Sequence, residues 1–246
     1  MTELHPMTEL LLAVASSRSY QPHAVPSPST VAQCTRQVWA MAREEPSDNR
    51  QVASTLAASM GTAVESVVTA LFEPLGISTK QVKILNPDII GCRGGTIDQV
   101  WCMDYTSQQY VVEVKRLGVW SYLDLVEKGV ELSHPSYYAQ VQLYMHALDI
   151  DKALLVAIAA DPTATRWVSE RIKKRTAPPP LWVEEIEYDV SETVGLIRRA
   201  RRQGQLIDDM TLTMADVPRD YNPLSDKFPC DYCQWQTKCI TAGERI

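Results

Sequence analysis

The sequence lacks the features of a membrane-spanning, exported or repetitive protein. Its most apolar window, Ala153 to Ala160, is far shorter than the roughly 20 residues that a bilayer span requires. The apolar run from Leu10 to Ala15 follows Glu3, His5 and Glu9 rather than basic residues, which is not the pattern of a signal peptide. The chain has 45% hydrophobic and 22% charged residues, and this composition excludes disordered, collagen-like and coiled-coil proteins. We therefore expect a folded, cytoplasmic protein without a membrane partner.

Basic residues are also in deficit, since 24 Lys and Arg stand against 30 Asp and Glu for a net charge of -6. This balance argues against a protein that coats nucleic acid by bulk charge, although a local basic groove stays compatible with it. The sequence has no GxGxxG motif, so a redox protein with a flavin or nicotinamide site is disfavoured. Six cysteines in such a chain suit a reducing compartment, where thiols bind metals or pack in the core.

Hydrophobic periodicity predicts an α/β protein with a mixed central β-sheet and helices packed on it. Residues 1–28 are expected to form a flexible arm, 29–217 the core, and 218–246 a Cys-rich tail. Helices are predicted over residues 30–44 (starting at Ser29 or Thr30), about 50–72, 137–148 and 191–207. Strands are predicted over residues 81–85, 96–103, 110–116, 153–160, 165–172 and 183–188. The second and third strands should pair as an antiparallel hairpin, and a turn at residues 160–164 should join the fourth and fifth.

Opposite charges share one face of the strand at residues 110–116. Period-two alternation places Glu113 and Lys115 on the same face, and hairpin pairing would bring Asp98 close to Glu113. An ordinary surface ion pair would give the same local pattern. Two carboxylates with a lysine are also a physical basis for phosphodiester hydrolysis, because hard oxygen ligands hold Mg²⁺ or Mn²⁺ and the lysine orients the nucleophile.

Further polar residues recur at spacings that would bring them to this site. Gln140 and Tyr144 are four residues apart and therefore share one helix face. Glu65 lies on an otherwise almost uncharged helical segment, where it is either solvent-facing or part of the metal site. Asp88 is a rival of Asp98 for the aspartate role, but Asp98 lies on the strand that leads into the hairpin.

Four short motifs follow one another along the chain: GTAVE ends at Glu65, GTID at Asp98, EVK at Lys115 and QVQLY at Tyr144. Together they resemble the PD-(D/E)XK nuclease superfamily in its RecB-type branch, which implies a restriction-endonuclease-like core. The resemblance implies that Asp98, Glu113 and the carbonyl of Val114 bind the metal, that Lys115 is the catalytic lysine, and that Gln140 and Tyr144 position the DNA strand or the lysine. It departs at Glu65, where the RecB-type pattern usually has His; Glu is more similar to lambda-type phage exonucleases.

The tail carries a C-x2-C-x5-C pattern at Cys230, Cys233 and Cys239, and Cys34 on the first predicted helix could supply a fourth thiolate. On ligand chemistry alone, four cysteines suit Zn²⁺ or an iron-sulfur cluster equally. One Cys before the nuclease core and three after it resemble the 4Fe-4S staple of CRISPR-associated and AddB-type nucleases, which implies a structural cluster. Cys92 and Cys102 are left without a function.

Two basic clusters could contact phosphates if they border the carboxylates; otherwise they are solvated surfaces. They comprise Arg166, Arg171, Lys173, Lys174 and Arg175, and then Arg198, Arg199, Arg201 and Arg202. Four aromatic residues that flank the carboxylate site in sequence could stack unpaired bases or belong to the core, namely Trp120, Tyr122, Tyr137 and Tyr138. We expect a metal-dependent DNase for single strands or DNA ends, with recombination, helicase or CRISPR adaptation proteins as candidate partners and the oligomeric state open. The competing hypothesis is a non-catalytic nucleic-acid-binding or partner-binding module that keeps the nuclease fold.

Overall fold

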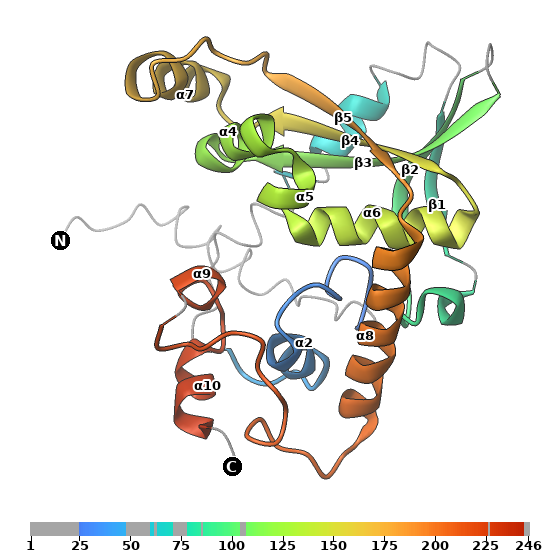
Figure 1. Ribbon diagram of the computed structural model, residues 1–246, viewed down its shortest axis with the longest axis vertical. Helices are drawn as coiled ribbons and strands as arrows, with labels where there is room; N and C mark the ends of the chain where they lie inside the picture. Colours follow the sequence, from blue (N-terminus) through green and yellow to red (C-terminus); the bar gives the residue numbers. More distant parts are fainter. Residues whose placement is uncertain are drawn as a thin grey trace, which may run out of the picture.

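The computed structural model describes residues 25–47, 60–61, 63–70, 78–84, 86–103, 107–225 and 227–243. It is an α/β structure in which helices flank a five-stranded mixed sheet of order β1-β2-β3-β4-β5, which confirms the predicted fold class (Figure 1). The strands are β1 (Ser78–Lys83), β2 (Thr96–Met103), β3 (Gln108–Leu117), β4 (Lys152–Ala159) and β5 (Leu181–Glu187). The helices include α2 (Thr35–Ala42), α4 (Val119–Lys128), α5 (Val130–Ser133), α6 (Pro135–Leu148), α7 (Pro162–Trp167), α8 (Val190–Asp208), α9 (Lys227–Cys230) and α10 (Gln236–Ala242). Short 3-10 and π-helical turns lie at Pro87–Ile90 (η2) and Val168–Ile172 (η3).

The predicted hairpin is present, and it opens at one end. Strands β2 and β3 are antiparallel, and their register runs from Met103 opposite Gln108 to Gln99 opposite Val112. Beyond this point β2 stays paired with β1, with Ile97 opposite Val82, while β3 pairs in parallel with β4 as far as Leu117. The two strands therefore separate beyond the Gln99–Val112 pair. Asp98 and Glu113, the candidate carboxylates, are the next residue on each strand.

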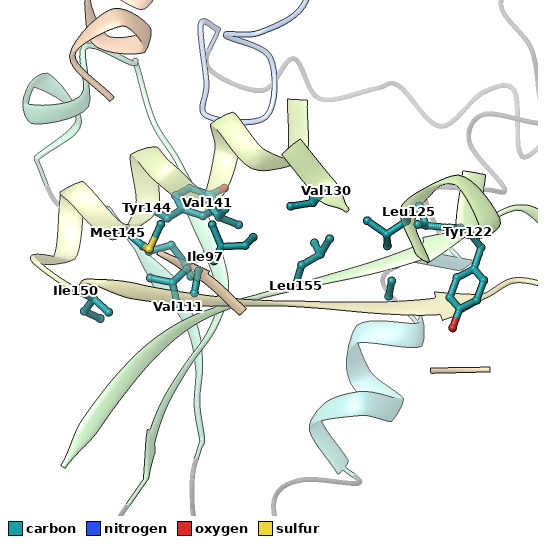
Figure 2. Close-up of a cluster of buried hydrophobic side chains, with 14 of the residues drawn as sticks. Ile97, Val111, Tyr122, Leu125, Val130, Val141, Tyr144, Met145, Ile150 and Leu155 are labelled. Atoms are coloured by element: carbon teal, nitrogen blue, oxygen red, sulfur yellow. The ribbon is translucent and has the colours of Figure 1, made fainter. Parts of the chain in front are cut away.

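The sheet is covered on both faces. On one face, α6 and α4 bury a core cluster with the odd-numbered residues of β3, including Val111 and Leu117 (Figure 2). In Figure 2, Val141 and Tyr144 of α6 lie above the sheet residues Ile97 and Val111. On the other face, Val112 and Val114 pack with Val68, which belongs to the helical segment 63–70. Residues on both faces of β3 thus pack against apolar side chains, as expected for a central strand.

A second region, beside the sheet, is built from the two ends of the described chain. Val38 and Trp39 of α2 pack with Ile207 near the end of α8 and with Trp235 of the tail. The Arg199 guanidinium of α8 donates hydrogen bonds to the carbonyls of Val31 (2.7 Å) and Gln33 (2.9 Å). Residues 25–28, assigned to the arm by sequence, are buried, and Val25 belongs to this same cluster. Figure 1 shows α8 running from α6 away from the sheet into this region.

The structure corrects or restricts three secondary-structure predictions and adds helices that were not predicted. The predicted strand at 165–172 is wrong: α7 and η3 occupy these residues, and Asp161 caps α7 through a 2.9 Å bond from the Ala164 N–H. Helix α4 was not predicted, and the tail contains the short helices α9 and α10. The first helix begins at Thr35 rather than at residue 29 or 30. Of the predicted helix 50–72, residues 60–61 and 63–70 are described and are helical, and the rest lies outside the described residues.

Within the described part of the chain, every helix is too short or too polar to cross a bilayer.

Candidate active site

Glu113 and Lys115 lie on the face of β3 that α6 covers. The side chain of Glu113 is 1% exposed and that of Lys115 is 22% exposed. The Lys115 ammonium donates a hydrogen bond to Oε1 of Glu113 and lies 4.9 Å from the centre of the Tyr137 ring. The pair is therefore a partly buried ion pair held under a helix, which distinguishes it from a solvent-exposed surface pair.

A chain of hydrogen bonds fixes Glu113 to α6 and to β2. The side-chain amide of Gln140 donates to Glu113 Oε1 at 2.9 Å and to the Tyr144 hydroxyl at 3.1 Å. The Tyr144 hydroxyl in turn donates to the carbonyl of Thr96 at 2.8 Å. Gln140 and Tyr144 thus meet the carboxylate site from one helix face, as their spacing predicts, and they act on Glu113 rather than on an open surface.

Asp98 lies at the fork between β2 and β3. Its Oδ2 accepts a hydrogen bond from the Val114 N–H at 3.0 Å, which replaces the next backbone bond of the hairpin. In a β-strand the N–H and C=O groups of one residue point to the same side, so the Val114 carbonyl also faces the fork. Asp98, Glu113 and this carbonyl are therefore oxygen donors on two adjoining strands.

Burial and mutual repulsion perturb the carboxylates of this site. Burial raises the pKa of Glu113 to about 7; Lys115 lowers it, and Asp98 and Glu65 raise it. Burial also raises the pKa of Asp98, against the opposing effects of the Val114 N–H and Lys115. The pKa of Glu65 is raised by burial and then by Asp98. Burial would lower the pKa of Lys115, but Glu113 and Asp98 outweigh it and hold the pKa above its usual value.

Glu65 belongs to the helical segment on the sheet face opposite α6. Its electrostatic interactions with Asp98, Lys115 and Glu113 show that it is close to the site. Three carboxylates share one lysine, and Oε2 of Glu113 is a buried atom with no hydrogen-bond partner among the described residues. Such an arrangement has excess negative charge and an unused oxygen ligand, both of which suit a divalent cation. Among the described residues, no group of three or more His, Cys, Asp or Glu side chains is placed so that it could hold a metal ion by itself. A cation at this site would need the Val114 carbonyl and water as ligands beside the carboxylates, a mixed set that Mg²⁺ commonly uses.

Asp88, the rival aspartate, lies in η2 and is exposed. The structure brings Asp98, not Asp88, into hydrogen-bond contact with the strand that carries Glu113.

The four cysteines Cys34, Cys230, Cys233 and Cys239 line one small cavity of about 20 Å³. Cys34 is the N-cap of α2, where the helix dipole stabilises negative charge, and the other three come from the tail around α9 and α10. The bond from the Cys233 N–H to the Cys230 carbonyl (3.0 Å) closes the turn that places these two side chains together. Segments from the two ends of the described chain thus converge on one thiol cavity, although no three described cysteines are placed so that they could hold a metal ion without rearranging.

The first basic cluster flanks the C-terminal end of β3. Lys173 bonds Glu127 of α4 at 3.3 Å and lies 5.9 Å from the ring centre of Trp120, which is 57% exposed. Arg166 pairs with Glu170 at 3.0 Å, while Arg171 and Lys174 are exposed. Since α4 begins two residues after Leu117, this basic surface adjoins the strand end next to Lys115.

The second basic cluster divides into a structural and an exposed part. Arg199 pairs with Asp220 at 2.7 Å and holds residues 31–33, so its role is structural. Arg198, Arg201 and Arg202 are exposed on α8, which leads away from the sheet (Figure 1).

Of the aromatic candidates, Tyr122 is fully buried in the core, and Tyr137 contacts Lys115.

A cavity of about 620 Å³ lies away from the carboxylate site, along β5 and the starts of α5 and α8. It is lined by five acidic residues, Glu131, Glu184, Glu185, Glu187 and Asp189. This surface repels polyanions, so it is unsuited to the nucleic acid expected from the sequence.

No protein-family model matches the chain, and no curated protein sequence matches it. Solved structures with a similar fold include SSO0001, which is 17% identical, with a TM-score of 0.52 over 96% of each chain. A phage-related exonuclease from Haemophilus somnus 129PT is 14% identical, with a TM-score of 0.47 over 72% of this chain and 82% of that one. The likeness to SSO0001 extends over almost the whole chain and shows a shared fold, a five-stranded α/β fold of the restriction-endonuclease type.

Proposed function

We propose that this protein is a metal-dependent deoxyribonuclease that hydrolyses phosphodiester bonds in single-stranded DNA or at DNA ends. The observation that supports this most strongly is the partly buried Glu113–Lys115 pair at a strand fork that also holds Asp98. Burying a carboxylate whose second oxygen has no described hydrogen-bond partner does not stabilise the fold, so packing alone does not explain Glu113. A catalytic position gains a preoriented metal ligand next to a cation.

Asp98, Glu113 and the Val114 carbonyl would hold Mg²⁺ or Mn²⁺, with Glu65 as a further ligand directly or through water. Such an ion supplies an activated water and polarises the phosphate when it is bound. Lys115 donates hydrogen bonds, and its ammonium would orient the attacking water or stabilise charge on the phosphate. Gln140 keeps Glu113 in one orientation through the 2.9 Å bond to Oε1, so the carboxylate cannot turn away when Lys115 moves toward substrate.

We place the DNA strand on the α4–α7–η3 surface, which comprises Trp120, Trp167, Arg166, Arg171, Lys173 and Lys174. Both tryptophans are more than half exposed, at 57% and 52%. Exposed aromatic rings beside cations suit unpaired bases and their phosphates, because stacking tolerates any base and the cations neutralise the backbone.

The four-cysteine cavity is proposed as a structural metal centre that joins the two ends of the chain. The chain pattern favours the 4Fe-4S cluster that the sequence resemblance implies. A single Zn²⁺ ion is the alternative, because four thiolates suit either centre on ligand chemistry. Metal analysis of the purified protein distinguishes the two.

The nuclease proposal is tested with labelled single- and double-stranded DNA in Mg²⁺ or Mn²⁺, comparing the wild type with Asp98→Asn, Glu113→Gln and Lys115→Met. Each substitution should lower the cleavage rate by about a thousandfold, because several kcal/mol of transition-state stabilisation are lost. Asp88→Asn is the matched control, since that aspartate is exposed, and it should cleave like the wild type.

Cleavage that survives Asp98→Asn and Glu113→Gln would refute the site. Metal-independent DNA binding without cleavage by the wild type would support the non-catalytic binding module instead.

A further inference from the structure

A buried guanidinium lies beside the four-cysteine cavity. Arg36 is 2% exposed, comes two residues after Cys34 on α2, and lines the same cavity as the four cysteines. Its Nη1 donates a hydrogen bond to Sγ of Cys239 at 3.4 Å. The sequence patterns that indicated the cysteines did not single out this arginine.

The other partners of Arg36 satisfy its N–H groups but carry no net charge. Nε and Nη2 donate to the Val217 carbonyl at 3.0 and 2.7 Å, and Nη1 donates to the carbonyls of Gly243 (3.1 Å) and Cys239 (3.5 Å). The carboxylate of Asp220 accepts from the Thr35 N–H and pairs with Arg199 instead. Within the described residues, no salt bridge joins Arg36 to a carboxylate.

An arginine in this position needs a negative charge nearby. Burying an unpaired ion costs several kcal/mol, and a guanidinium cannot lose its proton to avoid that cost. Carbonyl dipoles offset part of the cost. Among the described groups that Arg36 hydrogen-bonds, the Cys239 thiol is the one that can become anionic, since cysteines lose their protons when they bind a metal.

We propose that Arg36 is the counter-ion of a thiolate-bound metal centre at Cys34, Cys230, Cys233 and Cys239. Its charge favours the deprotonated cysteines, and its bond to Cys239 fixes the orientation of one ligand. It is a positioning residue, since it acts on the metal through Cys239. This inference rests on the structural metal centre proposed above, not on the nuclease activity.

The counter-ion role has measurable consequences for either metal. Hydrogen bonds and positive charge at a ligand sulfur raise the reduction potential of an iron-sulfur cluster, because they favour the more negative reduced state. For Zn²⁺ the same contacts strengthen binding. Loss of an outer partner of this kind commonly weakens metal affinity by about 10- to 100-fold.

The test uses the full chain purified without oxygen as wild type, Arg36→Gln, Arg36→Lys and the control Arg43→Gln. Arg43 is the C-cap of α2, at the opposite end of the helix from Arg36, and it contacts Trp39 and Asp209 rather than the cavity. Iron, sulfide and zinc are quantified, and metal transfer to a chelator is followed over time. If iron is present, the midpoint potential is also measured.

We expect Arg36→Gln to release metal about 10- to 100-fold more readily than the wild type and the control. Arg36→Lys keeps the charge but loses the planar fork, so it should release metal several-fold more readily than the wild type and less readily than Arg36→Gln. With iron, the midpoint potential should fall in Arg36→Gln and change less in Arg36→Lys, which a purely structural role would not produce.

Equal metal retention in all four proteins would overturn the proposal, as would a wild type that binds neither iron nor zinc. If Arg36→Gln does not fold, the Lys variant decides, and release at the wild-type rate counts against the proposal. DNA cleavage by the wild type is measured in parallel. A nuclease failure then appears as absent cleavage with the metal retained, whereas failure of this inference appears in the metal data alone.

Discussion

Glu113→Gln should make the metal-free protein more stable at neutral pH while abolishing cleavage. Glu113 is 1% exposed, and its pKa lies at about 7 in the folded protein against an ordinary value of 4.5. Between these values the folded state keeps a proton that the unfolded chain releases. The free energy of unfolding of the wild type therefore decreases as the pH rises through this window.

The size of the effect follows from the width of the window. About 2.5 pH units at 1.36 kcal/mol each give about 3 kcal/mol for the wild type between pH 4.5 and 7. A glutamine at this position has no such proton, and its oxygen can still accept hydrogen bonds from Lys115 and Gln140. As the pH rises from 4.5 to 7, the unfolding free energy of Glu113→Gln should therefore increase by about 3 kcal/mol relative to that of the wild type.

The measurement is urea unfolding followed by tryptophan fluorescence at pH 5, 6, 7 and 8 in the presence of EDTA. Glu131→Gln is the matched control, because Glu131 is exposed, and its curve should stay parallel to that of the wild type. Parallel pH dependences for the wild type and Glu113→Gln would refute the argument that burial of this carboxylate destabilises the fold.

Three further outcomes follow from contacts described above. Gln140→Leu removes the amide that bonds Glu113 and Tyr144, so kcat should fall with little change in KM, and unfolding should cost about 1–3 kcal/mol less in a denaturant titration. Arg199→Ala loses two carbonyl bonds and an ion pair and should destabilise by about 2 kcal/mol, whereas the exposed Arg198→Ala should stay within about 0.5 kcal/mol. Trp120→Ala should weaken the binding of a single-stranded oligonucleotide by about 1–3 kcal/mol in fluorescence anisotropy, with the unfolding midpoint almost unchanged because the ring is 57% exposed.

The part of the site that sequence patterns predict is the part set by local periodicity. Strand alternation placed Glu113 and Lys115 on one face, and helical spacing placed Gln140 and Tyr144 on another, and both pairs are in contact. The fork at Asp98 could not be predicted, because it depends on Thr96 and Ile97 of β2 staying paired with β1 where the pairing of β2 with β3 has ended.

Sequence patterns failed where two periodicities compete. Residues 165–172 alternate in polarity like a strand, yet Thr165, Val168 and Ser169 are the buried residues, which is a helical spacing. The signal that could have decided this is the Asp161–Pro162 pair, an N-cap followed by proline in the first turn. Arg36 was missed for a different reason, since nothing in a single sequence distinguishes a buried arginine from the exposed ones.

Helix α8 belongs to two separate hydrophobic clusters, one beside α6 and one at the thiol cavity. Leu196, Ile197 and Ala200 of α8 pack in the cluster next to α6, while Ile207 packs with α2 and the tail. Damage to the thiol cavity would therefore reach the sheet along this helix and along residues 25–31, since the Pro26 carbonyl accepts a 2.9 Å bond from the Arg93 N–H and Val31 packs beside α6. Amide hydrogen exchange in the metal-depleted protein should show fast exchange at the C-terminal half of α8 and retained protection at its N-terminal half. Helices α2, α9 and α10 would then unfold as one cooperative unit while the sheet that carries the candidate active site stays folded.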